Sequence, residues 1–337
     1  MVQARSSAMA GATLEVPWQE LRAIVGEANL KSATPEDAVL GVQPQMVALP
    51  GNEQEIAAAL KWADQNGLAV VPRGGGTKLD WGNPPARADL VLSTARLNRI
   101  LEHAWADMTA SVEAGATVQS FQDILAQHGQ RLAIDPLFPE HATIGGLLST
   151  NDSGTLRLRF GALRDLIIGV TIALADGTIA SSGGKVVKNV AGYDLPKLMT
   201  GAMGTLGVIT RAVFRLYPLP RTRRTVTLAV ENAKQAEDLV VAVQGSKLAH
   251  TGLQVRIGGE GKPEVDVRFA GTETGMDAQC ATLRGLAGGA RECGASMEVW
   301  ESLQELWRDA GNSLIAKFSV LPTEIGATCE KFRQIGG

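Results

Sequence analysis

The sequence is poor in residue types that whole classes of protein depend on. Only three cysteines occur among 337 residues (Cys280, Cys293 and Cys329), and they share no CxxC spacing. An odd, scattered set argues against a disulfide scaffold, and three thiols are too few for the four ligands of a typical iron–sulfur cluster. The cysteines therefore indicate a reducing, cytoplasmic setting.

Long apolar runs and blocks of one charge are also missing. No run of 18 or more apolar residues occurs, so no membrane span is expected. Residues 1–19 contain one arginine and no sustained apolar segment, which makes a poor signal peptide. The net charge is -3 and basic residues are not clustered, which argues against a nucleic-acid partner. Any attachment to the inner membrane would come through partner proteins.

Histidine is scarce as well, which bears on metal binding. The four histidines are His103, His128, His141 and His250, and no two have the spacing of metal ligands. The sequence therefore predicts no metal site.

Glycine, by contrast, is abundant: 38 residues, where a frequency of about 7% is usual. Many of them fall in four segments, which read PRGGGT, TIGGLLSTNDSG, GGKVVKNVAGYDL and GAMGTLGVI. A glycine-rich loop after a strand is either a tight turn or a nest of backbone N–H groups that binds an anion. The P-loop and Rossmann patterns are absent, because Gly184-Lys185 precedes Val186 and the later glycines are spaced GxxGxxG. Four such segments predict one long ligand of dinucleotide size.

The pattern of apolar residues predicts an α+β protein. Alternating strands and helices are expected up to about residue 135, and a glycine-rich region with strands at 167–175 and 208–216 follows. Asp176-Gly177 predicts a hairpin. From residue 222 the order β-α-β-β-α-β is ferredoxin-like, with its last strand at 296–300. A helix at 303–310, a strand at 314–321 and a helix at 324–332 are either the start of a second, uncompleted unit or a simple appendage.

The four glycine segments together resemble the FAD-binding domain of the vanillyl-alcohol oxidase/p-cresol methylhydroxylase (PCMH) type of flavoproteins, over roughly residues 40–220. KNVAGYDL followed by GTLGVIT is similar to the glycolate oxidase and D-lactate dehydrogenase branch. Within it, the chain is most similar to the smaller FAD-binding chains of bacterial glycolate oxidase. The resemblance implies an FAD-binding PCMH-type domain at 1–220, in two subdomains (1–135 and 136–220). A ferredoxin-like cap follows at 221–337, incomplete at its C-terminus.

The resemblance also implies which residues bind FAD. The first loop would wrap the pyrophosphate, the second segment would run on to the isoalloxazine, the third would lie near the flavin ring and the fourth near the adenine. The implied residues are Arg73, Gly74, Gly75, Gly76, Thr77, Thr143, Gly145, Gly146, Ser149, Asn151, Gly154, Asn189, Gly192, Tyr193, Asp194, Gly207, Val208 and Ile209. Gly145, Gly146 and Gly207 could equally be packing glycines, Asp194 a helix cap and Tyr193 a core residue. Thr77 cannot form a histidyl link, so non-covalent FAD is expected.

The function implied is oxidation of a 2-hydroxy acid, glycolate to glyoxylate, by one subunit of a complex. The alternative is a self-sufficient FAD-dependent oxidoreductase acting on another hydroxy acid, such as D-lactate. Catalytic residues are not identified; His141 and Tyr193 are weak candidates, and Arg157, Arg159 and Arg164 are candidate anion contacts. Expected partners are the small substrate, a second flavoprotein subunit and an iron–sulfur subunit. An apolar cap surface at Leu314, Ile315, Phe318 and Val320 would suit such an interface.

Overall fold

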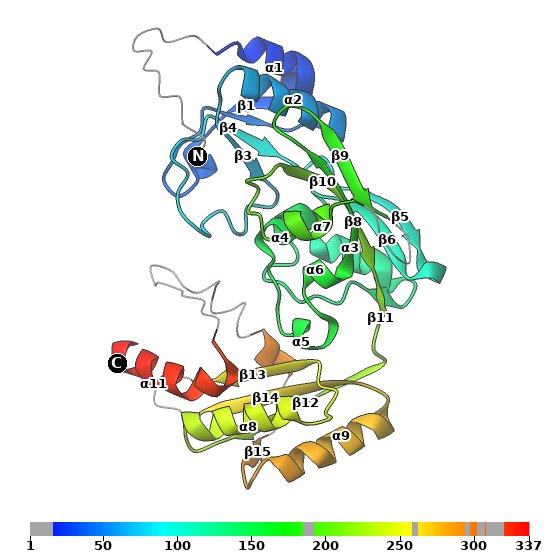
Figure 1. The fold of residues 1–337 in the computed structure, drawn as a ribbon, viewed down its shortest axis with the longest axis vertical. Coiled ribbons are helices and arrows are strands. Elements are labelled where there is room, and N and C mark those ends of the chain that lie inside the picture. The colour runs from blue at the N-terminus through cyan, green and yellow to red at the C-terminus, as the bar shows by residue number, and fades with distance from the viewer. Residues whose placement is uncertain are drawn as a thin grey trace.

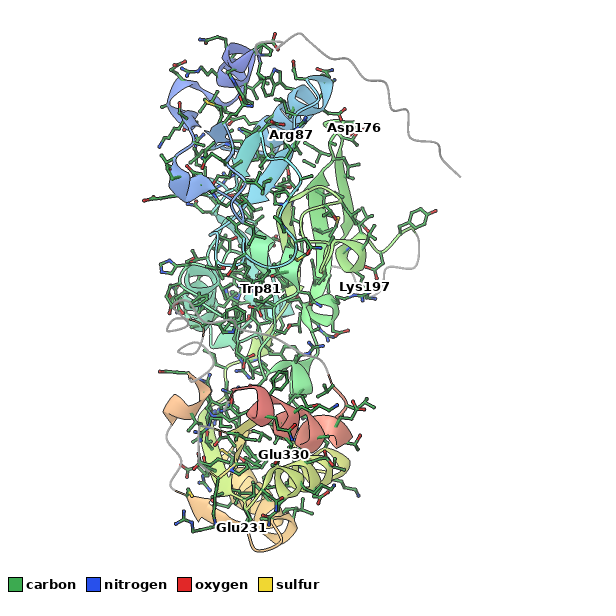
Figure 2. The ribbon with its side chains drawn as sticks, turned by 90° about the vertical axis from the view of Figure 1, so that its left-hand side faces the viewer. Trp81, Arg87, Asp176, Lys197, Glu231 and Glu330 are labelled. Atoms are coloured by element: carbon green, nitrogen blue, oxygen red, sulfur yellow. The ribbon has the colours of Figure 1, made fainter. Side chains whose placement is uncertain are left out.

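The structure is a computed structural model, which describes residues 16–184, 192–257, 262–293, 297–301, 307 and 320–336. These residues form an elongated molecule in which a cap lies at one end of a larger two-sheet body (Figure 1). In Figure 2, Arg87 and Asp176 lie at the far end of the body, Trp81 and Lys197 near its middle, and Glu231 and Glu330 in the cap. The α+β class predicted from the sequence is confirmed.

The first sheet has the strand order β1-β2-β4-β3, in which β2, β4 and β3 run parallel. Strand β4 is buried along its whole length, as its apolar run predicts for a parallel strand. Helix α2 begins after Asn52, whose side chain accepts a hydrogen bond from Glu55 N at 2.9 Å. The elements are α1 (Trp18–Val25), β1 (Leu30–Ser32), β2 (Met46–Ala48), α2 (Glu53–Gln65), β3 (Val70–Arg73) and β4 (Leu90–Ser93).

The second sheet is antiparallel, with the order β5-β6-β10-β8-β9. The predicted hairpin is confirmed: Leu174 N donates to Thr178 O at 2.9 Å, and Gly177 has φ +84°. A two-stranded ladder, β7 with β11, lies beside this sheet's core. The strands are β5 (Ile100–Ala104), β6 (Thr109–Glu113), β7 (Gln130–Arg131), β8 (Ile167–Ala173), β9 (Ile179–Gly183), β10 (Val208–Arg215) and β11 (Tyr217–Pro218).

Helix α4 lies where the sequence suggested a glycine-rich loop. Its first turn is capped by the Thr143 hydroxyl, which accepts from Gly146 N at 3.4 Å. Ile144, Leu147 and Leu148 are buried in the core of the second sheet, and this burial overrides the low helix propensity of two glycines. The helices of this region are α3 (Val118–Ala126), α4 (Ile144–Thr150), α5 (Arg157–Phe160), α6 (Leu163–Leu166) and α7 (Leu195–Met199).

The cap has the predicted ferredoxin-like topology, with the antiparallel order β13-β14-β12-β15. The strand predicted at 296–300 is wrong: the last described strand of this sheet is at 291–293, and Met297–Trp300 is a 3-10 turn. The Trp300 indole N–H donates to Thr225 Oγ1 at 2.9 Å, which fixes this turn on the sheet. The elements are β12 (Thr222–Ala229), α8 (Ala233–Gly245), β13 (Gly252–Arg256), β14 (Glu264–Gly271), α9 (Glu273–Leu286), β15 (Arg291–Cys293) and α11 (Ile325–Gly336).

The end of the chain is described only in part. Helix α11 confirms the helix predicted at 324–332. The helix expected at 303–310 and the strand expected at 314–321 fall largely outside the described residues, as do Leu314, Ile315 and Phe318. Val320 of the expected apolar surface is 43% exposed. Among the described residues, no helix has the length and apolarity to cross a membrane.

Candidate functional site

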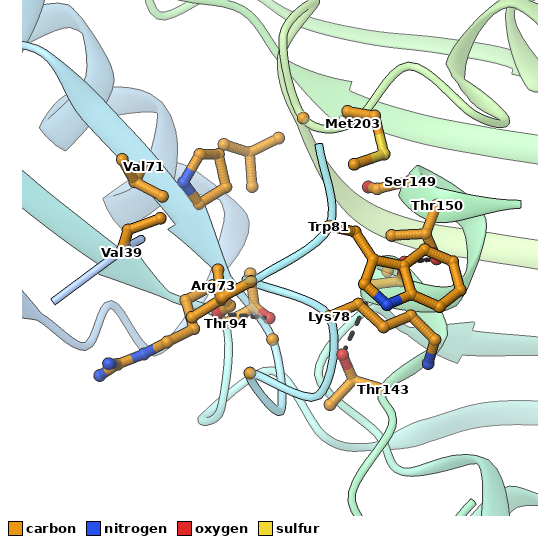
Figure 3. Close-up of a pocket in the computed structure, with 18 of the residues that line it drawn as sticks. Val39, Val71, Arg73, Lys78, Trp81, Thr94, Thr143, Ser149, Thr150 and Met203 are labelled. Atoms are coloured by element: carbon orange, nitrogen blue, oxygen red, sulfur yellow. Dashed lines mark hydrogen bonds between the residues drawn. The ribbon is translucent and has the colours of Figure 1, made fainter. Parts of the chain in front are cut away.

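A cavity of about 480 Å³ opens where the two sheets of the body meet (Figure 3). Its walls come from β3 and the loop after it, from α4, and from the turn that leads into β10. Three of the four glycine-rich segments therefore converge on one space. The site residues predicted from the sequence that line it are Arg73, Gly74, Gly75, Gly76, Thr77, Thr143, Gly145, Gly146, Ser149, Gly207, Val208 and Ile209.

The first glycine loop packs directly on the segment before α4. A Cβ on Gly74 would lie 2.0 Å from Thr143 Oγ1, and a Cβ on Gly75 would lie 1.8 Å from the carbonyl oxygen of His141. Gly76 has φ +75°, which L side chains rarely adopt. The sequence pattern predicts that the absent side chains make room for a ligand, whereas at Gly74 and Gly75 the close neighbours are Thr143 and the backbone of His141.

The same loop presents backbone donors. Within the described part of the chain, the amides of Gly74, Gly75, Gly76 and Thr77 donate to no protein acceptor. In α4, by contrast, the first amides are satisfied: Gly145 N, for example, donates to Ala114 O at 2.7 Å. Unpaired amides in a glycine loop form a nest suited to phosphate oxygens. The donors that remain for an anion are therefore in the loop and not in α4.

The two cations of the cavity wall are each paired with a carboxylate. Arg73 Nη1 lies 2.7 Å from Asp37 Oδ1, and Figure 3 shows its guanidinium directed away from the glycine loop. Lys78 Nζ lies 3.3 Å from Asp152 Oδ2, with side-chain exposures of 6% and 3%. The Thr34 backbone N–H and then Arg73 hold the pKa of Asp37 below its usual value, against the opposing effect of burial. The positive charge of Arg73 and Lys78 is thus largely compensated.

Residues just after α4 lie outside the cavity wall. Asn151 ends α4 with φ +50°, and its Oδ1 is buried without a partner among the described residues. A Cβ on Gly154 would lie 2.2 Å from Asp135 O, so this glycine is required by packing. Gly145 is a packing glycine too, since its Cβ would meet that of Ala114 at 2.9 Å. The close contact at Gly145 agrees with the packing alternative that the sequence left open for that glycine, whereas for Gly154 only a role in FAD binding was expected.

The third glycine segment is described only at its end, and Asn189 lies outside the described residues. Asp194 caps α7 by accepting from Lys197 N at 3.2 Å, as its alternative interpretation proposed. Tyr193 is 89% exposed, so the expectation of a core tyrosine is wrong. Gly192, Tyr193 and Asp194 do not line the cavity. Their role in flavin binding stays a prediction.

The catalytic candidates are not brought together. His141 is exposed and lines a second, more open depression beside Gly74 and Gly75 rather than the cavity described above. Tyr193 points into neither of these spaces. Among the described residues, no group of three His, Cys, Asp or Glu side chains could hold a metal ion.

Further residues that the sequence pattern did not indicate also line the cavity. They are Lys78, Trp81, Thr94 and Met203. The Trp81 ring lies 5.7 Å from the ring of Trp307, which comes from the cap segment. No local pattern marks Trp81 or Met203, because their place in the wall depends on which segments the fold brings together.

Comparison with known proteins identifies this region. Residues 44–183 match the family described as FAD binding domain. The match takes in the first two glycine segments. The predicted cofactor, FAD, is supported by this match, and the glycine cavity belongs to the matched domain for most of its wall.

Solved structures agree on the fold. The chain superposes on alkyldihydroxyacetonephosphate synthase with a TM-score of 0.77 at 18% identity, covering 94% of this chain and 74% of that one. It superposes on p-cresol methylhydroxylase with a TM-score of 0.69 at 14% identity, covering 91% and 68%. At these identities the likeness concerns the fold alone, and it confirms the PCMH-type arrangement.

Curated relatives share more of the sequence than these solved structures do. The glycolate oxidase subunit GlcD of Bacillus subtilis is 36% identical over 211 residues, which are 63% of this chain and 45% of the relative. A D-lactate dehydrogenase of Archaeoglobus fulgidus is 36% identical over 198 residues, covering 59% and 44%. The chain thus spans less than half the length of these two relatives.

Proposed function

We propose that this chain is the FAD-binding subunit of a glycolate-oxidising complex, in which electrons pass from the flavin to a partner protein. Residues 1–220 are the FAD-binding part in this proposal, and residues 221–337 are a cap against which the substrate lies. The observation that carries the proposal is the cavity of the FAD domain, with its unpaired loop amides. The name of the Bacillus relative, a subunit of glycolate oxidase, supports the substrate and the assembly.

The residues of the cavity fit a dinucleotide. The free amides of Gly74 to Thr77 supply donors for a pyrophosphate. The cations beside them, Arg73 and Lys78, are paired with carboxylates at the edges of the loop, so these pairs leave the amides free. Val70, Val208 and Ile209 give the cavity apolar walls. When bound, FAD supplies the acceptor for the two electrons removed from the hydroxy acid. The protein's part is to bind and orient the cofactor and to exclude water.

A second candidate is a self-sufficient oxidoreductase acting on D-lactate. The D-lactate dehydrogenase of Archaeoglobus fulgidus supports it, because it matches this chain at the same identity as the glycolate oxidase subunit. The two candidates differ in the need for a partner and in the substrate.

One experiment separates them. The FAD-loaded chain is assayed with glycolate and with D-lactate and an artificial electron acceptor, first by itself and then with the proteins that co-purify with it. Turnover of glycolate that requires the partners supports the subunit proposal. Full turnover by the isolated chain contradicts it. The cofactor released by acid precipitation is expected to be FAD and to leave no flavin in the pellet.

A further inference from the structure

A group of arginines lies where the FAD domain meets the cap. Arg131 comes from β7, Arg223 from the start of β12 and Arg268 from β14. Figure 1 shows β11 leading from the body into β12 and α5 lying against the cap near β13. We call Arg131, Arg223 and Arg268, with Asp135 between them, the junction cluster. It contains three guanidinium groups and one carboxylate.

The one carboxylate is already engaged. Asp135 accepts from Thr155 Oγ1 at 2.9 Å and from Leu156 N at 3.0 Å, and Arg268 Nη2 lies 3.3 Å from its Oδ2. Arg268 also lies with its Cζ 4.5 Å from the centre of the Trp300 ring. Asp135 therefore serves the loop at 154–156 and Arg268, and it does not pair with Arg131.

Arg131 is the unusual member of the cluster. Arg131 is only 8% exposed, and its side chain makes no ion pair or hydrogen bond within the described residues. Nε is fully buried, and Cζ lies 5.1 Å from the centre of the Phe160 ring. Burial, and then the charges of Arg223 and Arg268, lower the pKa of Arg131 to about 10, while Asp135 acts in the opposite direction.

A buried guanidinium without a partner is costly, because desolvation of the charge is not offset by an anion or an acceptor. Perturbed buried groups of this kind cluster at functional sites, where a bound ligand can supply the missing partner. Access is available, since Arg223 is exposed and the Asp135 side chain is 30% exposed. A guanidinium binds a carboxylate through two parallel hydrogen bonds, which match its planar fork.

We propose that the junction cluster binds the carboxylate of a small organic acid, with Arg131 as the buried anchor and Arg223 at the entrance. Phe160 and Trp300 supply apolar faces beside the charges. The excess of two positive charges favours an acid with one or two carboxylates. The site itself does not depend on the proposed function; only its assignment to the substrate carboxylate rests on that proposal.

The test uses the FAD-loaded chain and oxalate, which carries carboxylates but no C–H bond to oxidise. Melting temperature is measured as oxalate is added, with sodium chloride at matched ionic strength as the reference. We expect a rise of about 3–5 °C at saturating oxalate for the unaltered chain. Arg291→Met, at an exposed arginine of β15, is the matched control and should behave like the unaltered chain.

Arg131→Met should abolish the rise due to oxalate, and Arg223→Gln, at an exposed position, should weaken oxalate binding several-fold without affecting folding. An equal rise in all four proteins, or no rise in the unaltered chain, would overturn the proposal.

Where the rise depends on Arg131, KM for glycolate distinguishes the source of the ligand. A raised KM at unchanged kcat in Arg223→Gln assigns the site to the substrate, and an unchanged KM assigns it to a separate acid. Absence of glycolate turnover would contradict the proposed function, and the oxalate measurement would still decide whether the junction cluster binds a carboxylate.

Discussion

We propose anion binding both at the glycine cavity and at the junction cluster, but the two sites are built in opposite ways. In the cavity wall each cation has its own carboxylate, Arg73 with Asp37 and Lys78 with Asp152, and the donors left for a ligand are backbone amides. In the junction the one carboxylate, Asp135, pairs with Arg268, and Arg131 has no carboxylate partner. The comparison indicates that a glycine loop can bind phosphate through backbone N–H groups without net side-chain charge, whereas anion binding at the junction depends on the charge of its arginines.

The largest effect is expected from Gly75→Ala. Its Cβ would lie 1.8 Å from His141 O, so the loop or the segment before α4 must move and the amide nest is lost. We expect FAD to bind roughly 10- to 100-fold more weakly, since overpacking costs about 1–3 kcal/mol. Gly285→Ala is the control, because nothing lies within 4 Å of that position. Titration of the apoprotein with FAD measures both, and equal affinities would show that the close contact does not shape the site.

Lys78→Met tests the compensated charge of the cavity wall. It leaves the Asp152 carboxylate buried without its partner, so we expect a loss of about 3 kcal/mol in the free energy of unfolding of the apoprotein. Lys197→Met breaks an exposed pair with Asp194, where both side chains are about half exposed, and should cost less than about 1 kcal/mol. Urea denaturation compares them. Similar losses would mean that Lys78 and Asp152 are not a tightly buried pair in solution.

The two sites should differ in how strongly their affinity for an anion depends on salt. Raising sodium chloride from about 50 to about 500 mM screens side-chain charges that reach solvent. We expect oxalate binding at the junction to weaken several-fold, while FAD binding to the amide nest changes by less than about two-fold. Equal salt dependence of the two affinities would contradict the proposed difference in how the sites recognise anions.

The smallest effect concerns the Arg73–Asp37 pair. Because the pKa of Asp37 is lowered in the folded protein, its contribution to stability is complete above the ordinary pKa of an aspartate and is lost as the pH falls through the lowered value. In Arg73→Met, the free energy of unfolding should therefore fall less steeply as the pH is lowered below about 4. This is the pH range between the ordinary and the lowered pKa of Asp37. Unfolding at several pH values would reveal the difference, and parallel curves for the two proteins would count against the pair.

The sequence allowed much of this architecture to be predicted, because its signals were local. The ferredoxin-like cap follows from strand and helix periodicity, the Asp176-Gly177 turn from its residues, and three glycine segments were correctly expected at one site. Helix α4 was missed because burial of Ile144 and its neighbours outweighs the glycines. No local sequence pattern distinguishes Trp81 or Arg131, because their roles arise from contacts with segments that are distant in the chain.

The central claim is that the glycine cavity binds FAD through the loop after β3. Its most direct measurement is the flavin content of the purified chain, together with that of Gly75→Ala prepared in the same way. The account predicts stoichiometric FAD, released without a covalent bond, in the unaltered chain and a strongly reduced content in the variant. A flavin-free chain, a chain that carries FMN, or an unchanged FAD content in Gly75→Ala would contradict it.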